Sequence, residues 1–196
     1  MVLLVITLPL AVHFRIPSLW FLAPFALLTV TRRRYDEYGL TFREPGSLRF
    51  HVRVCLVIFG SYCVAHYGYA RWWLGRSFHP TLPPGFPTLV VDQLLVVGLS
   101  EEFFFRGYLQ TQLNGWLGRP YRFLGAQWGW GLIAASVLFG ICHLVEGDLT
   151  RLRVIFFGVF AGWLRERTGT IAVPAAYHGF ANLLYDFMQR SMRSVT

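Results

Sequence analysis

The chain has 196 residues, of which 55% are hydrophobic and only 14% are charged. A soluble domain usually carries about 25% charged residues, so this composition argues against a soluble globular fold and favours a membrane protein. The net charge of +8 comes from arginines, with no lysine, and these arginines lie in short patches between long apolar blocks. That distribution is typical of membrane topology signals, and it argues against a nucleic-acid-binding protein.

The first half of the chain predicts membrane-embedded helices separated by loops. The apolar block at residues 1–31 is interrupted by a histidine, an arginine and a proline, so it forms either one kinked span or a short re-entrant pair. The polar segment after it is rich in turn residues and indicates a surface loop. A second span is expected at about 52–74. The proline-rich stretch 75–87 cannot be helical and predicts a connecting loop.

Four more helices are expected in the second half, at about 88–113, 128–145, 152–164 and 170–189. Most of the apolar blocks approach the roughly 20 residues that a helix needs to cross a bilayer. The predicted fold is therefore all-α, a polytopic transmembrane helical bundle of about six spans, or seven if the first block is a pair. It forms a single integral membrane domain.

The arginine distribution predicts the orientation of this domain. The loop after the first block carries five arginines: Arg32, Arg33, Arg34, Arg43 and Arg49. Under the positive-inside rule that loop is cytoplasmic, and we expect a multi-pass protein of the cell (inner) membrane. The end of the fourth span and the start of the third then lie on the non-cytoplasmic side.

Several polar side chains fall inside the predicted spans, where an ionisable group costs roughly 2.5–3.5 kcal/mol at the bilayer centre and is a functional candidate. They are Glu101, Glu102 and Arg106 on the third helix, His143 on the fourth, and His178 and Asn182 on the sixth. The interior of the bundle is the place where groups from three helices can meet. The sequence therefore predicts a polar site there.

The spacing of these residues separates their expected roles. Glu102 and Arg106 are four residues apart, so they can form an ion pair within one helix, and we interpret that pair as structural. Glu101 points about 100° away around the helix and has no such partner. His178 and Asn182 share one helix face because they are also four residues apart.

Glu101 together with two imidazoles can activate a water molecule. The carboxylate can act directly as a general base, or the three side chains can hold a divalent metal, because one Glu and two His are a known zinc ligand set. The metal ligands would then be Glu101, His143 and His178, although no HExxH motif is present. The plain alternatives are an interfacial histidine at His143 and an inter-helix hydrogen bond at Asn182.

Three motifs in order resemble those of a known family: EEFFFR fits EExxxR, FGICH fits FxxxH, and HGFAN fits HxxxN. The chain resembles the CPBP intramembrane proteases (CAAX protease and bacteriocin-processing, also called Abi), relatives of the type II CAAX prenyl endopeptidase. The resemblance covers about residues 88–189, the expected catalytic core. Residues 1–87 supply the N-terminal spans and loops.

This resemblance implies a role for each motif position. Glu101 would be the general base that activates the attacking water, and His143 its partner in binding that water. His178 and Asn182 would stabilise the tetrahedral oxyanion. Supporting positions complete the motifs: Glu102, Arg106 and Phe139. A water-only glutamic mechanism without a cofactor is favoured, with zinc as the alternative.

The expected partners are membrane lipids and a protein or peptide substrate with a membrane-proximal cleavage site, such as a C-terminal sorting or CAAX-like signal. Two other functions compete with proteolysis. A small proton-coupled transporter would also carry Glu and His in mid-membrane, but the chain is short and shows no inverted repeat. A non-catalytic membrane scaffold or immunity protein on the same fold is the second alternative.

Overall fold

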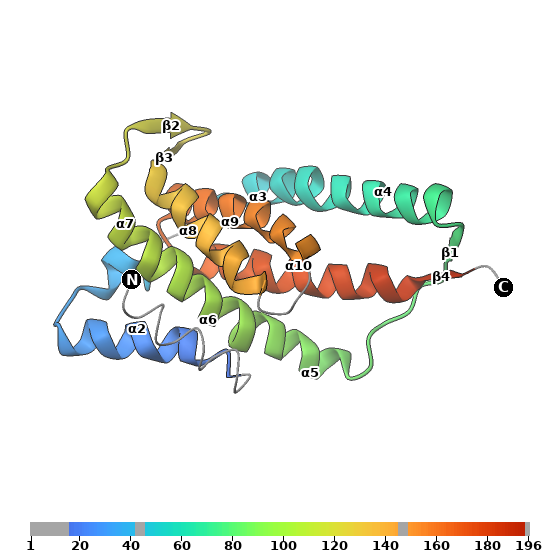
Figure 1. Cartoon of the computed structure of the whole chain (residues 1–196), viewed down its shortest axis with the longest axis horizontal. Helices are drawn as coiled ribbons and strands as arrows, with labels where there is room; N and C mark the ends of the chain where they lie inside the picture. The colour runs from blue at the N-terminus through green and yellow to red at the C-terminus, as the bar shows by residue number, and fades with distance from the viewer. Residues whose placement is uncertain (1–15, 42–45, 145–148, 195–196) are drawn as a thin grey trace.

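The computed structural model describes residues 16–41, 46–144 and 149–194 (Figure 1). Within the first apolar block it places one helix, α2 (Leu19–Val30). Whether the block forms one span or two depends on residues 1–15, which lie outside the described residues. A short 3-10 turn, Tyr35–Tyr38, follows α2 in the arginine-rich loop.

The predicted second span is a continuous helix over Leu48–Trp73. It consists of α3 (Leu48–Cys55), α4 (Ser61–Gly68) and two π-helical turns, Leu56–Gly60 and Tyr69–Trp73. Among the described residues it is the one helix long and apolar enough to cross a membrane. Most of its apolar surface is exposed, as expected for a helix that faces lipid.

The third helix is longer than the predicted range of about 88–113. It runs without a break from Phe86 to Leu117. Its parts are α5 (Phe86–Val91), a π-helical segment (Asp92–Gly98), α6 (Leu99–Glu102), a second π-helical segment (Phe103–Leu109) and α7 (Gln110–Leu117). Three further helices follow close to the predicted ranges: α8 (Trp130–His143), α9 (Val154–Thr168) and α10 (Ala172–Ser191).

Two short antiparallel ribbons depart from the all-helical prediction. β1 (Arg76–Phe78) pairs with β4 (Met192–Ser194), and β2 (Tyr121–Phe123) pairs with β3 (Ala126–Trp128). Leu124 and Gly125 both have positive φ angles between β2 and β3, which is the backbone of a tight two-residue hairpin turn. The fold is therefore mostly helical, and the strands lie in segments predicted as loops or chain end.

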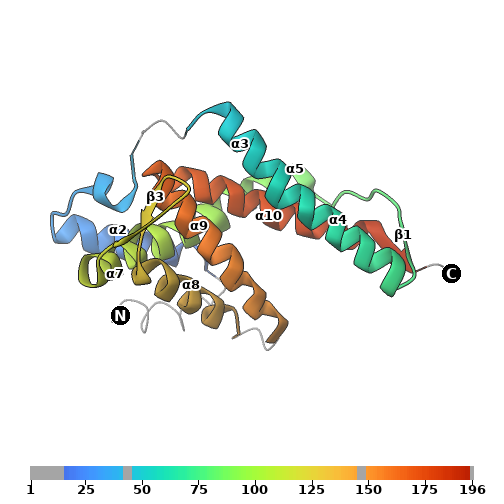
Figure 2. The same cartoon turned by 90° about the horizontal axis from the view of Figure 1, so that it is seen from above.

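The helix Phe86–Leu117 lies at the centre of the bundle and contacts α2, α8, α9 and α10. The helix Leu48–Trp73 runs along α10, and the β1–β4 ribbon joins their ends (Figure 1 and Figure 2). α8 has 14 residues, fewer than the roughly 20 needed to span a bilayer. The central helix is long enough, but it carries both glutamates and Arg106, which lower its hydropathy. The number of spans therefore stays a prediction.

Small residues let the central helix approach α10 closely. A Cβ on Gly98 would lie 2.8 Å from the carbonyl oxygen of Ala175, and a Cβ on Gly179 would lie 2.7 Å from the carbonyl oxygen of Gln93. Helices in membranes commonly associate through such small residues. This contact brings the glutamates of the central helix beside His178 on α10.

The close approach makes a testable prediction about stability. Gly179→Ala should lower the free energy of unfolding by about 1–3 kcal/mol, because the methyl group meets backbone atoms that cannot move aside. Gly115→Ala is the matched control, since a Cβ on this helical glycine of α7 meets nothing within 4 Å, and it should raise stability by up to about 1 kcal/mol. Thermal unfolding in detergent measures both, and equal midpoints would contradict the packing.

Candidate active site

Glu102 and Arg106 form the predicted ion pair, fully buried in the bundle. Arg106 Nη1 donates to Glu102 Oε1 over 3.0 Å, and both side chains are 0% exposed. The guanidinium also lies 4.2 Å from the centre of the Phe139 ring, a cation–π geometry. Phe139 therefore supports the pair directly.

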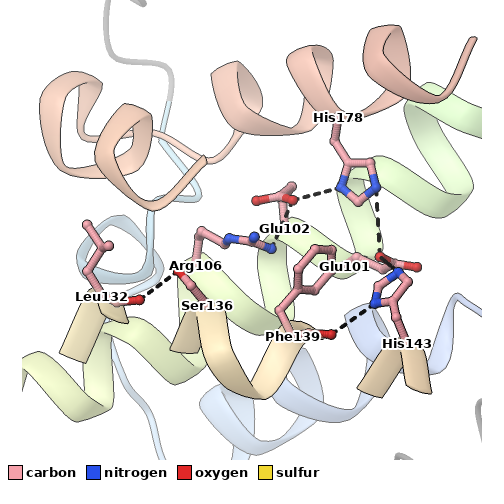
Figure 3. A network of polar contacts seen from close by, with 8 residues as sticks. All are labelled: Glu101, Glu102, Arg106, Leu132, Ser136, Phe139, His143 and His178. Carbon is pink, nitrogen blue, oxygen red and sulfur yellow. Dashed lines mark hydrogen bonds and ion pairs between the residues drawn. The ribbon is translucent and has the colours of Figure 1, made fainter. Parts of the chain in front are cut away.

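Glu102 has a second partner that the sequence did not reveal. His178 Nδ1 donates to the same Oε1 atom of Glu102 over 2.7 Å, and His178 is itself buried. A carboxylate bonded to one imidazole nitrogen fixes the orientation and the proton position of the ring. Glu102 thus holds His178 so that its other nitrogen, Nε2, faces Glu101 (Figure 3).

Glu101, His143 and His178 come together from three helices, as the sequence predicted. Glu101 Oε2 lies 3.8 Å from His178 Nε2 and 4.0 Å from His143 Nε2. This oxygen is buried and makes no hydrogen bond within the described residues. Separations of this length are too long for direct hydrogen bonds, but they suit one bridging water.

His143 presents its Nε2 atom to this cluster because its other nitrogen is engaged. Nδ1 lies 2.9 Å from the carbonyl oxygen of Phe139, one turn earlier on α8. A carbonyl only accepts, so Nδ1 carries the proton and a neutral ring has its lone pair on Nε2. His143 and Glu101 are then both acceptors toward the space between them, which a water can fill by donating one hydrogen to each.

Asn182 lies near His178 on α10, but its side chain is hydrogen-bonded to Gln93 and not to the histidine cluster. Its Nδ2 donates to Gln93 Oε1 over 2.8 Å, and both side chains border the same cavity as Glu101. Gln93 was missed by the sequence analysis. The available signal was an uncharged polar residue in an apolar helix, about two turns before Glu101.

The cluster borders a cavity of about 800 Å³ at one end of the bundle. Apolar side chains of several helices form much of its wall: Ile58, Phe59, Leu89, Val97, Phe139, Val154, Phe157, Ala181 and Leu184. His143 is the last residue of α8, so the cavity lies where α8 ends and α9 begins. An apolar cavity with a few convergent polar groups is the usual form of a ligand or active site.

The family model described as type II CAAX prenyl endopeptidase Rce1-like matches residues 83–184, which is more than half of the chain. The chain belongs to this family. Every motif residue singled out above lies inside the matched segment of this Rce1-like protein. No curated protein and no solved structure matches the chain. The resemblance inferred from the three motifs is thus confirmed, and the protein is of the CAAX-type intramembrane protease class.

The alternative of a metal-dependent Rce1-like enzyme requires a fit between the side chains and an ion. Tetrahedral zinc with bonds of about 2.0–2.1 Å separates its ligand atoms by about 3.3 Å. The Glu101 and histidine atoms are 3.8 and 4.0 Å apart. Within the described residues, no group of three or more His, Cys, Asp or Glu side chains is arranged to hold a metal. The observed separations are about 0.5–0.7 Å longer than those between zinc ligands, and we derive no step through a metal.

Proposed function

We propose that this Rce1-like protein is an intramembrane endopeptidase in which Glu101 activates a water for attack on a peptide bond. The observation that carries the proposal is the convergence of Glu101 Oε2 with the Nε2 atoms of His143 and His178 beside one cavity. The proposed substrate is a membrane-associated or exported protein with a C-terminal sorting or CAAX-like signal. Membership of the Rce1-like family supports proteolysis in general. The arrangement of Glu101, His143 and His178 around the cavity supports the role proposed for each side chain.

The first step is attack by water on the scissile carbonyl carbon. The water donates one hydrogen to Glu101 and the other to His143, so its lone pairs point into the cavity. Glu101 takes the proton as the new C–O bond forms. The carbonyl oxygen becomes an oxyanion, and donors from His178 and Asn182 stabilise it. Glu101 then passes the proton to the leaving nitrogen as the C–N bond breaks.

The role of His178 sets its protonation state. To donate toward the oxyanion, its Nε2 must carry a hydrogen, while Nδ1 already donates to Glu102. The ring is then a cation. Together with Arg106 it balances the charges of Glu101 and Glu102, so the buried cluster is neutral overall. A balanced cluster avoids the high cost of an unpaired buried charge.

The direct test is cleavage of an S-farnesylated CAAX peptide by the purified protein in detergent, with the products identified by mass spectrometry. Wild type should cleave the peptide at one bond, and Glu101→Gln should not. Glu37→Gln is the matched control, because this glutamate lies in the exposed turn after α2. Absence of cleavage by wild type would instead favour the scaffold function, and equal cleavage by wild type and Glu101→Gln would remove Glu101 from the mechanism.

Gln93 is expected to contribute to catalysis through Asn182. Gln93→Leu removes the acceptor that holds the Asn182 amide, so kcat should fall by roughly 10-fold, the loss expected when one net hydrogen bond of about 1–1.5 kcal/mol disappears. Gln112→Leu is the control, because it loses a comparable bond to Tyr38 away from the cavity. If both variants lose activity equally, the Gln93 effect is structural.

We further propose a multi-pass topology in which the cavity opens to the non-cytoplasmic side. The cavity lies where α8 ends and α9 begins, at the membrane side that the arginine distribution assigns to the exterior. In a cysteine-free background, a cysteine replacing Arg71 should react with a membrane-impermeant thiol reagent in intact cells. A cysteine replacing Arg33 should react only after lysis, and labelling at position 33 in intact cells would reverse the orientation.

A further inference from the structure

The β2–β3 hairpin presents an apolar tip at one end of the bundle. Phe123 and Leu124, at the turn, are 60% and 68% exposed. The helix ends and the strand beside this tip add further exposed apolar side chains: Trp116, Leu117, Tyr121 and Trp130. Figure 1 shows the hairpin projecting from the bundle where α7 ends and α8 begins. A contiguous exposed apolar patch of this kind marks a contact with a protein or a membrane.

The hairpin is fixed to the bundle, so the exposure of its tip belongs to a built structure. Trp163 Nε1, on α9, donates to the carbonyl oxygen of Phe123 over 3.2 Å. The rings of Tyr121 and Trp128 pair across the two strands with their centres 5.0 Å apart. These contacts hold the strands against α9 and leave the tip side chains pointing outward.

The turn itself carries a bulky side chain at a strained backbone position. Leu124 has a φ angle of +44° and Gly125 one of +78°. Asn, Asp or Gly is the usual first residue of such a turn, and a positive φ at a bulky residue is an outlier. Packing within the protein does not explain the leucine, because most of its side chain is exposed. Strain of this kind points to a function of the side chain.

The charge of the hairpin fits a lipid surface. Segment 118–129 contains Arg119 and Arg122 and no acidic residue. Arg119 is paired with Glu166 over 3.0 Å, so the net positive charge of the hairpin lies at the exposed Arg122. Proteins of the Rce1-like family are membrane proteins, and exposed Trp and Tyr beside a cation are typical of the interface between membrane and water.

The backbone limits how deeply the hairpin can enter a bilayer. A two-stranded ribbon has open edges, whose unpaired N–H and C=O groups are not tolerated in the hydrocarbon region. The strands must therefore lie at the level of the headgroups, and only the turn can reach the acyl chains. The hairpin lies at the same end of the bundle as the arginine-rich loop, since Arg165 Nη2 donates to the carbonyl oxygen of Glu37 while the adjacent Glu166 pairs with Arg119.

We propose that the β2–β3 hairpin is an interfacial membrane anchor. Phe123 and Leu124 insert among the upper acyl chains, about 5–10 Å into the boundary between headgroups and chains, and Arg122 contacts anionic headgroups. In the proposed topology this end is cytoplasmic, where anionic lipids are concentrated. The anchor does not depend on the proposed protease activity, because the hairpin and the cavity lie at opposite ends of α8.

The test measures the depth of the tip in nanodiscs that hold one copy of the full chain. In a cysteine-free background, Leu124→Cys is labelled with the fluorophore NBD, and the lipids carry a doxyl quencher near the top of the acyl chain. The label at position 124 should be quenched several-fold and should be protected from a polar reductant of NBD. Glu37→Cys is the control, because this residue lies in the exposed polar turn after α2, and its label should be neither quenched nor protected.

The lipid composition tests the contact of Arg122. Replacing part of the phosphatidylcholine in the discs by phosphatidylglycerol should increase the quenching at position 124. Arg122→Gln should abolish this increase, whereas Arg76→Gln, at the ribbon on the other end of the bundle, should leave it unchanged. Equal quenching in the two lipids would contradict the contact with anionic headgroups.

A variant of the otherwise native chain tests why the turn carries leucine. Leu124→Asn supplies a residue that the turn favours, so the thermal unfolding midpoint in detergent should not fall. Leu28→Asn is the control for lost packing, because Leu28 is 1% exposed, and it should lower the midpoint clearly. A comparable fall for Leu124→Asn would show that this leucine packs within the protein and would overturn the anchor.

Two results of the depth measurement would also overturn it. A label at position 124 that is unquenched and open to the reductant would place the tip in water. A label that is quenched no more than the one at position 37 would show that the quencher does not report insertion. If proteoliposomes with many copies protect position 124 while single-copy discs do not, a second copy of the chain covers the hairpin instead of lipid.

Discussion

Glu101→Gln should reduce kcat for peptide cleavage by about 1,000-fold, within the range of 10²–10⁴ that a positioned general base supplies. Glutamine keeps the size of the side chain but cannot accept the proton of the attacking water. His143→Ala should cause a similar loss, because it removes the second acceptor that orients this water. Stopped assays with an S-farnesylated CAAX peptide measure both.

The double variant is more informative than either single one. If Glu101 and His143 act on one water, Glu101→Gln with His143→Ala should be hardly slower than Glu101→Gln alone, since residues that act as a unit are strongly non-additive. Losses that multiply would mean that the two side chains act in separate steps. Thermal unfolding of the same samples shows whether a lost rate reflects a lost fold.

Arg106→Met should lower the free energy of unfolding by about 3–5 kcal/mol, the largest stability effect expected in this protein. The arginine is fully buried beside Glu102, and its removal leaves the buried cluster with one negative charge in excess. Methionine fills much of the same volume, so little of the loss comes from a cavity. Chemical or thermal unfolding in detergent measures the change.

A second variant separates charge from packing. Adding Glu102→Gln to Arg106→Met removes the excess charge and should recover most of the lost stability, although His178 loses the negative charge of its partner and activity stays low. Arg49→Met is the control at an exposed position, with an expected change within about 0.5 kcal/mol. If the double variant is no more stable than Arg106→Met, the loss of the ion pair is not the cause of the lower stability.

Local spacing was enough to predict much of this protein. The four-residue interval between Glu102 and Arg106 predicted their ion pair, and the apolar blocks predicted the long helices. The individual hydrogen bonds between helices could not be predicted from local spacing. The His178–Glu102 bond joins positions 76 residues apart in the chain, and it depends on the close approach at Gly98 and Gly179.

Two other features of the structure differ from the sequence predictions. The two ribbons were missed because each strand has only three residues, too few for an alternating pattern to be recognised. Asn182 was expected to act with His178, and its bond to Gln93 was not foreseen because glutamine in an apolar helix gives no specific signal.

The most direct test of the proposed mechanism is the cleavage rate of wild type after dialysis against a strong chelator, measured beside untreated wild type and Glu101→Gln. Hydrolysis by a water held on Glu101 predicts an unchanged rate in chelator and a loss of about 1,000-fold in the variant. A rate abolished by chelator and restored by zinc would contradict it and assign Glu101, His143 and His178 to a metal. A Glu101→Gln variant as active as wild type would contradict any catalytic role for this carboxylate.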